Sequence, residues 1–142
     1  MLCLVPTPIG NLEDISKRSL RVLEEAELIF CEDTRVTKKL LNLLGEKNNL
    51  DFSNKEFKSF HSHNENQILQ TLDKETFTKN VVYVSDAGMP CVSDPGATLV
   101  DYCIKNQIPY DVLPGANAIL TAYAMSGFSH TTFSFYGFLD HK

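Results

Sequence analysis

The chain has 142 residues, a net charge of −5 and an apolar fraction of 43%, which is typical of one ordinary globular domain with its own core. The acidic balance argues against a protein that binds nucleic acid by bulk electrostatics, because phosphate contacts need clustered lysine and arginine side chains. The sequence lacks an apolar run of about 18 residues and an amino-terminal signal-peptide pattern, so we expect no membrane span and a cytoplasmic protein.

Strand-like and helical patterns alternate from the start of the chain. Residues 2–5 form an apolar run that ends at the proline-rich turn 6–11, where neither a helix nor a paired strand can continue. Asp14 is predicted to cap a helix. One face of that helix would carry Ile15, Ser19, Val22 and Ala26.

A second apolar run, 28–31, is predicted to form a strand that delivers Glu32, Asp33 and Arg35 to the same edge of the sheet as the first turn. A helix through Val36 and Leu44 should follow, with Gly45 ending it as a C′ glycine. The sequence therefore predicts two carboxylates and an arginine at the candidate site.

Residues 57–60 look like a short third strand, with His61 and His63 at its carboxyl end and Asn64 as the cap of the next helix. The two histidines stand at strand spacing, as metal ligands could, but no third ligand is evident. A single histidine acting on a substrate, or simply a polar loop, fits the pattern better. We therefore predict no metal.

The buried run 81–84 leads into a polar loop, 85–96, that contains two aspartates, two glycines and two prolines. Asp94 is predicted as the N-cap of the following helix, with Pro95 in its first position. Such loops lie where open parallel sheets bind ligands, so we expect a cofactor here and expect Asp86 to contact it.

The last part of the chain contains a fifth strand, 110–113, a tight turn at 114–118 and a helix that ends near Gly127. Residues 132–136 are predicted as a terminal strand. Because so little chain follows this apolar segment, we expect a polypeptide cut before a second domain, with a naturally small domain as the alternative.

Five alternations of strand and helix predict an α/β domain with a mainly parallel five-stranded sheet and helices on both faces. The chain has neither a GxGxxG fingerprint nor a P-loop, which weakens dehydrogenase and NTPase interpretations. Its four cysteines form no CxxC pair and are predicted to be free and largely buried.

Five segments, taken in order, resemble the RNA-modifying branch of the tetrapyrrole methylase family. They are residues 5–12, 31–35, 61–65, 84–96 and 113–116. Members that modify tetrapyrroles have a glycine-richer first loop than the segment Pro6-Thr7-Pro8-Ile9-Gly10 found here. The similarity extends from about Leu4 to Leu139 and covers the amino-terminal domain of a two-domain enzyme.

The resemblance implies S-adenosylmethionine-dependent methylation of a cytidine ribose 2′-hydroxyl in small-subunit ribosomal RNA by a homodimer. The cofactor would lie between two α/β domains, the first being residues 1–142 and the second absent from this chain. Family positions that line the cofactor pocket fall on Pro8, Ser85, Asp86, Met89, Asn117 and Ala118.

Removal of the hydroxyl proton calls for a base, and Glu32, Asp33 and His61 are the candidates. Glu32 matches a proposed catalytic acid of some relatives, and Arg35 is suited to holding a phosphate or a carboxylate. This half alone is expected to be inactive and to bind RNA weakly. Methylation of a tetrapyrrole, or a noncatalytic dimerisation or ligand-sensing role, remains the alternative.

Overall fold

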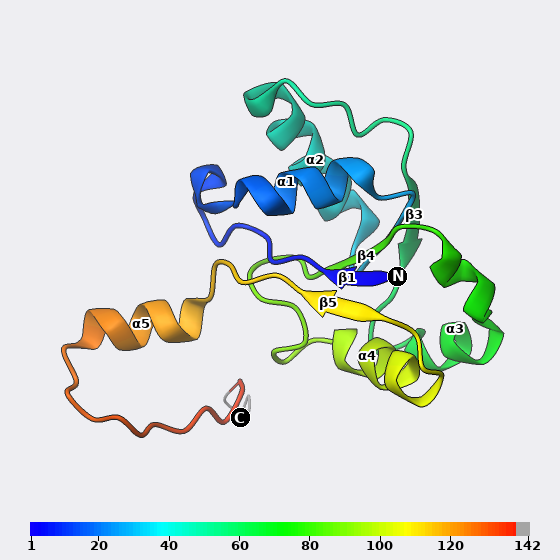
Figure 1. Cartoon of the computed structure of the whole chain (residues 1–142). Helices are drawn as coiled ribbons and strands as arrows, with labels where there is room; N and C mark the ends of the chain where they lie inside the picture. Colours follow the sequence, from blue (N-terminus) through cyan, green and yellow to red (C-terminus); the bar gives the residue numbers. More distant parts are fainter. Residues whose placement is uncertain (139–142) are drawn as a thin grey trace.

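A computed structural model of the chain describes residues 1–138 (Figure 1). Five strands form one sheet in the order β3-β2-β4-β1-β5, and every neighbouring pair is parallel. The strands are β1 (Leu2–Leu4), β2 (Leu28–Cys31), β3 (Glu56–Ser59), β4 (Val81–Val84) and β5 (Tyr110–Val112). The predicted five-stranded parallel sheet is confirmed.

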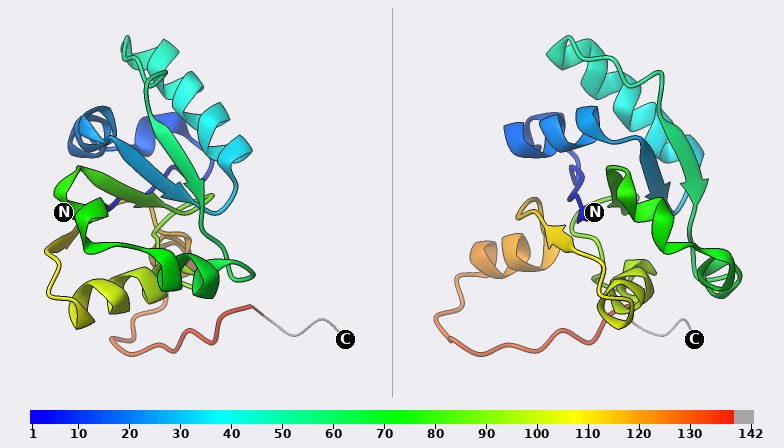
Figure 2. Two further views of the ribbon diagram at one scale, coloured as in Figure 1. Left: turned by 90° about the vertical axis from the view of Figure 1, so that its right-hand side faces the viewer. Right: turned by 45° about the vertical axis from the view of Figure 1, so that its right-hand side comes forward.

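The helices form a layer on each face of the sheet, as predicted (Figures 1 and 2). One layer contains α1 (Lys17–Glu25) and α2 (Thr34–Asn48), and the other contains α3 (Glu65–Thr71) and α4 (Gly96–Lys105). Short 3₁₀ helices, η1 (Leu12–Asp14) and η2 (Lys74–Thr78), precede α1 and β4, whereas α5 (Ala118–Ser126) projects from the body.

Alternate residues of the three central strands, β1, β2 and β4, serve two separate cores. Cys3 and Val5 pack in the core that also contains Leu23 of α1, whereas Leu2 and Leu4 pack with α4 on the other face. Each fully buried aliphatic side chain contributes about 1.5–3 kcal/mol relative to its exposed state. The two cores therefore fix which loops meet at the carboxyl edge of the sheet.

Two helix boundaries differ from the prediction. Asp14 belongs to η1, which Asn11 caps, so the cap of α1 is Ser16, whose hydroxyl accepts the Ser19 N–H at 2.9 Å. Helix α2 continues through Gly45 and ends at Asn49, which is left-handed at φ 55°. A Cβ on Gly45 would lie 2.6 Å from the Leu50 carbonyl oxygen, so this glycine permits a close backbone approach instead of ending the helix.

Two predicted caps are used differently. Helix α4 begins at Gly96 with Pro95 as its cap residue, although the Asp94 carboxylate still accepts the Gly96 N–H at 3.4 Å. Asn64 stands at the cap position of α3 but makes no side-chain bond to that helix. It fastens the loop after β3 instead, accepting the His61 N–H at 2.8 Å.

The predicted strand at 132–136 is wrong, because these residues have no regular secondary structure. They form no ladder with either edge strand, β3 or β5, and a strand without a partner leaves its backbone groups unpaired. The segment runs exposed past α5 (Figure 1). Residues 139–142, which the predicted domain included, lie outside the described residues.

All four cysteines are free, in agreement with the prediction, and three of them are buried. Within residues 1–138, none of the helices combines the length and the apolar composition that a bilayer crossing requires.

Candidate active site

The loops after β1 and β4 are bonded to each other at the carboxyl edge of the sheet. Thr7 and Gly88 exchange two backbone hydrogen bonds of 3.0 Å, and the Thr7 hydroxyl donates to the Ser85 carbonyl at 3.3 Å. The nearly fully buried Ser85 hydroxyl donates to the Gly88 carbonyl at 3.0 Å. These bonds hold the polar loop in one shape before any ligand arrives.

Asp86 connects the loop after β4 to the loop after β2. Its carboxylate accepts the backbone N–H of Asp33 at 3.3 Å. The predicted convergence of these loops is therefore correct, although this contact of Asp86 is with the protein backbone.

An apolar hollow of about 270 Å³ lies between this loop and the start of α5. Three of the predicted cofactor residues, Met89, Asn117 and Ala118, line it together with Ile9, Phe135 and Phe138. Asn117 also caps α5, accepting the Leu120 N–H at 2.9 Å. Pro8, Ser85 and Asp86 do not line the hollow but belong to the loops that shape it.

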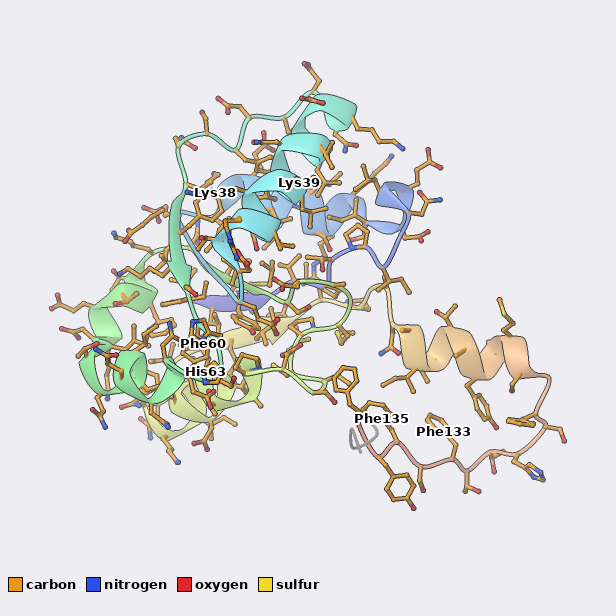
Figure 3. All side chains as sticks on the ribbon, turned by 180° about the vertical axis from the view of Figure 1, so that it is seen from behind. Lys38, Lys39, Phe60, His63, Phe133 and Phe135 are labelled. Carbon is orange, nitrogen blue, oxygen red and sulfur yellow. The ribbon has the colours of Figure 1, made fainter. Side chains whose placement is uncertain are left out.

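The segment after α5 closes one side of this apolar hollow. Figure 3 shows Phe133 and Phe135 on that segment, separate from the sheet body. Phe133 stacks on Tyr123 of α5 with ring centroids 4.7 Å apart. Aromatic side chains from outside the α/β body thus complete a site that the sheet begins.

A second hollow, of about 510 Å³, is acidic and lies beside the first loop system. It brings together Glu32 and His61 with Glu65 and Asp94, and also with Thr98. Burial raises the pKa of the Glu32 carboxyl, and the charges of Asp86 and Asp94 raise it further. A carboxylate with a raised pKa is a better proton acceptor than an ordinary one.

Tyr83 of β4 lies near Asp94 and Glu32, two residues of the acidic hollow, and the sequence predicts it only as part of a buried strand. Its side chain is fully buried and, among the described residues, its hydroxyl has no hydrogen-bond partner. Burial and the neighbouring charges of Asp94 and Glu32 raise the pKa of this phenol. Nothing in the sequence around 81–84 indicated an unpaired hydroxyl near the site.

Asp33 and Arg35 line neither hollow. The Asp33 carboxylate accepts the Arg35 backbone N–H at 2.8 Å and pairs with its guanidinium at 2.6 Å. These hydrogen bonds lower the pKa of Asp33 to about 2, which makes it a weak base. The Arg35 side chain is 87% exposed. Of the three charged residues predicted at the site after β2, Glu32, Asp33 and Arg35, only Glu32 lines one of the two hollows.

The two histidines after β3 lie close together, with ring centroids 5.9 Å apart. Figure 3 shows His63 beside Phe60 at this end of the sheet. Within residues 1–138, no group of three or more histidine, cysteine or acidic side chains is arranged to hold a metal ion.

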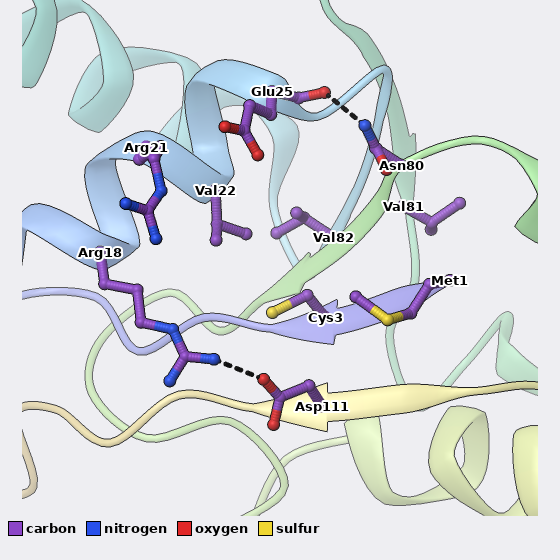
Figure 4. Close-up of a pocket in the computed structure, with 10 residues that line it drawn as sticks. All are labelled: Met1, Cys3, Arg18, Arg21, Val22, Glu25, Asn80, Val81, Val82 and Asp111. Carbon is purple, nitrogen blue, oxygen red and sulfur yellow. Dashed lines mark hydrogen bonds and ion pairs between the residues drawn. The ribbon is translucent and has the colours of Figure 1, made fainter.

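A further hollow, of about 180 Å³, lies beside α1 near the amino ends of β1 and β4 (Figure 4). Arg18 pairs there with Asp111 at 2.7 Å, and the Asn80 amide donates to the Glu25 carbonyl at 3.3 Å. Burial raises the pKa of the Cys3 thiol, so it is not a ready nucleophile. This hollow lies away from the carboxyl edge where α/β sheets bind ligands.

Comparisons with known proteins find relatives along nearly the whole chain. The family model of Tetrapyrrole (Corrin/Porphyrin) Methylases matches residues 1–139. Ribosomal RNA small subunit methyltransferase I of Campylobacter fetus is 56% identical over 142 residues, covering 99% of this chain and 52% of its own length. The Helicobacter pylori J99 protein of the same name is 49% identical over 149 residues, with 100% and 52% covered. The chain thus spans about half the length of these relatives.

Solved structures share the fold at low identity. Diphthine synthase matches with a TM-score of 0.65 and 16% identity, covering 89% of this chain and 48% of that one. Uroporphyrin-III C-methyl transferase from Thermus thermophilus, complexed with S-adenosyl homocysteine, matches with a TM-score of 0.58 and 20% identity, covering 86% and 51%.

Proposed function

Because this chain belongs to the tetrapyrrole methylase family, we propose that it is the amino-terminal half of an S-adenosylmethionine-dependent methyltransferase acting on small-subunit ribosomal RNA. The observation that carries the proposal is the 56% identity, along nearly the whole chain, to a relative named for that activity. The proposed enzyme is cytoplasmic and works as a homodimer with a second domain in each subunit.

S-adenosylmethionine is assigned to the apolar hollow beside α5. The hollow offers apolar contacts from Met89 and Ile9 and a polar side chain from Asn117, which suits a ligand with both apolar and polar parts. Gly88 is left-handed at φ 85°, and a Cβ there would lie 3.1 Å from the Ile9 side chain. Pro8, Ser85, Asp86 and Ala118 complete the proposed set, and the second domain supplies the remaining contacts.

When bound, the cofactor supplies a methyl group on a sulfonium for in-line displacement. The 2′-hydroxyl oxygen of a cytidine ribose would bond to the methyl carbon as that carbon separates from sulfur, and the hydroxyl would give up its proton to a base of the protein. We assign Glu32 to accept this proton, because it lines the acidic hollow and has a raised pKa. His61 lines the same hollow and is the second candidate, whereas the low pKa of Asp33 disfavours it.

The test compares the complete protein with this chain alone. Calorimetric titration with S-adenosylmethionine, with ATP as the control ligand, should give binding in the complete protein and weak or no binding in the chain. Labelled methyl groups should appear in small-subunit RNA, and digestion to nucleosides should give 2′-O-methylcytidine. Absence of cofactor binding in both proteins would overturn the proposal.

Methylation of a tetrapyrrole is the second candidate, favoured by the fold shared with uroporphyrin-III C-methyl transferase. It predicts tight binding of a coloured substrate and no label in RNA. A noncatalytic dimerisation or sensing domain would show self-association without any cofactor-dependent reaction. The same two assays distinguish these outcomes.

A further inference from the structure

The charges of this chain are segregated, although its net charge is −5. Residues 34–60, which contain α2 and β3, carry six lysines and arginines against three acidic residues, a net charge of +3. The remainder of the chain is therefore strongly acidic. A local excess of positive charge on an acidic protein marks the surface where a polyanion would be bound.

Part of this positive segment forms a groove of about 270 Å³ between α2 and the strand at the edge of the sheet. Polar side chains at the groove come from Lys38, Asn42, Ser53 and Lys55, and apolar ones from Leu41, Phe52 and Phe57. The Lys38 ammonium lies 5.2 Å from the centre of the Phe57 ring. Cations beside aromatic rings are the combination that binds nucleic-acid strands.

The four cations of the segment other than Lys38 and Lys39 have partners. Arg35 pairs with Asp33, Lys47 with Glu13 at 3.0 Å, and Lys58 with Glu56 at 3.3 Å. The Lys55 ammonium donates to the Glu24 carbonyl.

Lys38 and Lys39 differ from these cations, because in residues 1–138 neither lies within salt-bridge distance of an acidic group. Figure 3 labels both lysines on α2; Lys38 lines the groove, and Lys39 is the next residue of the helix. They are the charges most available to a ligand.

We infer that this groove, which we call the α2 groove, binds the phosphate backbone of the RNA substrate next to the nucleotide that is methylated. The inference rests on the proposed function. Helix α2 begins directly after Glu32 and Asp33, so its amino-terminal end lies at the candidate active site. At 1.5 Å per residue, Lys38 lies about 8 Å and Asn42 about 14 Å along the helix from Asp33.

These separations correspond to a few nucleotides, since successive phosphates along one duplex strand rise about 3.4 Å. Phosphate contacts supply position and affinity but little sequence information. The α2 groove would therefore orient the strand and leave the choice of nucleotide to other contacts. The α2 groove is also a basic surface on this domain, which the negative net charge of the whole chain does not indicate.

The experiment measures RNA binding by the complete protein with Lys38→Gln and Lys39→Gln combined. The probe is a labelled small-subunit ribosomal RNA fragment, titrated at several salt concentrations. Loss of two phosphate contacts should lower the slope of log K against log salt by about 1.4 and weaken binding about tenfold at low salt. Affinity for S-adenosylmethionine and the melting temperature should stay unchanged.

The matched control combines Lys74→Gln and Lys79→Gln, which removes the same amount of positive charge. These two lysines flank Phe77, a residue of the core on the opposite face of the sheet from the α2 groove. This pair should leave the slope near that of the wild type. Lys39→Gln alone guards against a folding effect, because Lys38 contacts the Phe57 ring, whereas Lys39 has no such aromatic contact within residues 1–138. It should lower the slope by about 0.7.

Equal losses in the two double variants would overturn the inference in favour of a general charge effect. Unchanged RNA binding by the Lys38/Lys39 variant, in an enzyme that methylates RNA, would also overturn it and point to an acidic protein as the ligand of the groove. A wild-type protein that neither binds nor methylates the RNA would instead remove the proposed function, before any variant is compared.

Discussion

Glu32 shows how one residue's surroundings set its chemistry. It follows the buried strand β2 and lines the acidic hollow, where burial and two neighbouring carboxylates disfavour its charged form. The next residue, Asp33, is turned to the start of α2 and has its pKa lowered by Arg35. Adjacent carboxylates with opposite pKa shifts are typical of separate roles.

The variant Glu32→Gln in the complete enzyme should lower kcat for methyl transfer by about 10²–10⁴-fold, the range for loss of a general base. Cofactor affinity should be unchanged. In the wild type, kcat should fall as pH drops below the raised pKa of Glu32, and this limb of the pH profile should vanish in the variant. Wild-type turnover in Glu32→Gln would remove this residue from the mechanism, and His61→Asn would then be tested.

The same shift affects stability. A carboxyl whose pKa is raised in the folded state retains its proton there to higher pH than in the unfolded chain, so its contribution to stability is lost as pH rises through the folded pKa. Glu32→Gln should therefore flatten the pH dependence of the free energy of unfolding between the ordinary pKa of a glutamate and the raised pKa of Glu32. A steeper dependence in the variant would contradict the assigned cause.

Tyr83 gives a second prediction, because its buried hydroxyl has no partner among residues 1–138. An unsatisfied buried polar group costs about 1–3 kcal/mol, and removing it relieves this cost. Tyr83→Phe should raise the free energy of unfolding by about 1 kcal/mol in denaturant titrations. A loss of stability would show that the hydroxyl has a partner, such as an ordered water.

Helix starts are the feature to test at the scale of elements. Both Asp14 and Ser16 are residue types that cap helices, but only Ser16 accepts a backbone N–H at the start of α1. Ser16→Ala should cost about 1 kcal/mol of stability, whereas Asp14→Ala should cost much less. Thermal unfolding of the two variants side by side decides between them, and equal losses would contradict the observed cap.

For the whole molecule, the apolar surface of α5 and residues 128–138 is the outstanding feature. The helix has no buried residue, Met125 is 85% exposed and Phe128 is 68% exposed. Exposed apolar patches of this kind mark surfaces that pack against a protein partner. We propose that this surface contacts the second domain of the proposed enzyme or the other subunit of the proposed dimer.

This chain alone should therefore bind an apolar fluorescent dye and self-associate in sedimentation experiments. Met125→Glu should reduce both effects and leave the circular dichroism spectrum unchanged, because the side chain contributes little to either core. The complete protein should bind less dye. A monomeric chain without dye binding would contradict this role for the surface.

The sequence by itself determined the five strands of the parallel sheet, the family and the loops that meet at the carboxyl edge of the sheet. These depend on local signals, since a short apolar run bounded by turn formers is buried wherever the chain takes it. Asn117 and Met89 were named from the family resemblance, and both line the apolar hollow, but their contact with the cofactor stays a prediction.

The tertiary structure alone decided the features that depend on residues distant in the chain. Gly45 is needed because the Leu50 carbonyl approaches it, and residues 132–136 remain irregular because no strand edge pairs with them. The hydrogen bonds of Asp33 to Arg35 give this carboxylate a different environment from that of its neighbour Glu32. The fold also brings Lys38 of α2 beside Phe57 of β3, which forms the α2 groove. Local patterns report the preferences of the backbone, whereas the partner of each side chain is set by what the fold packs against it.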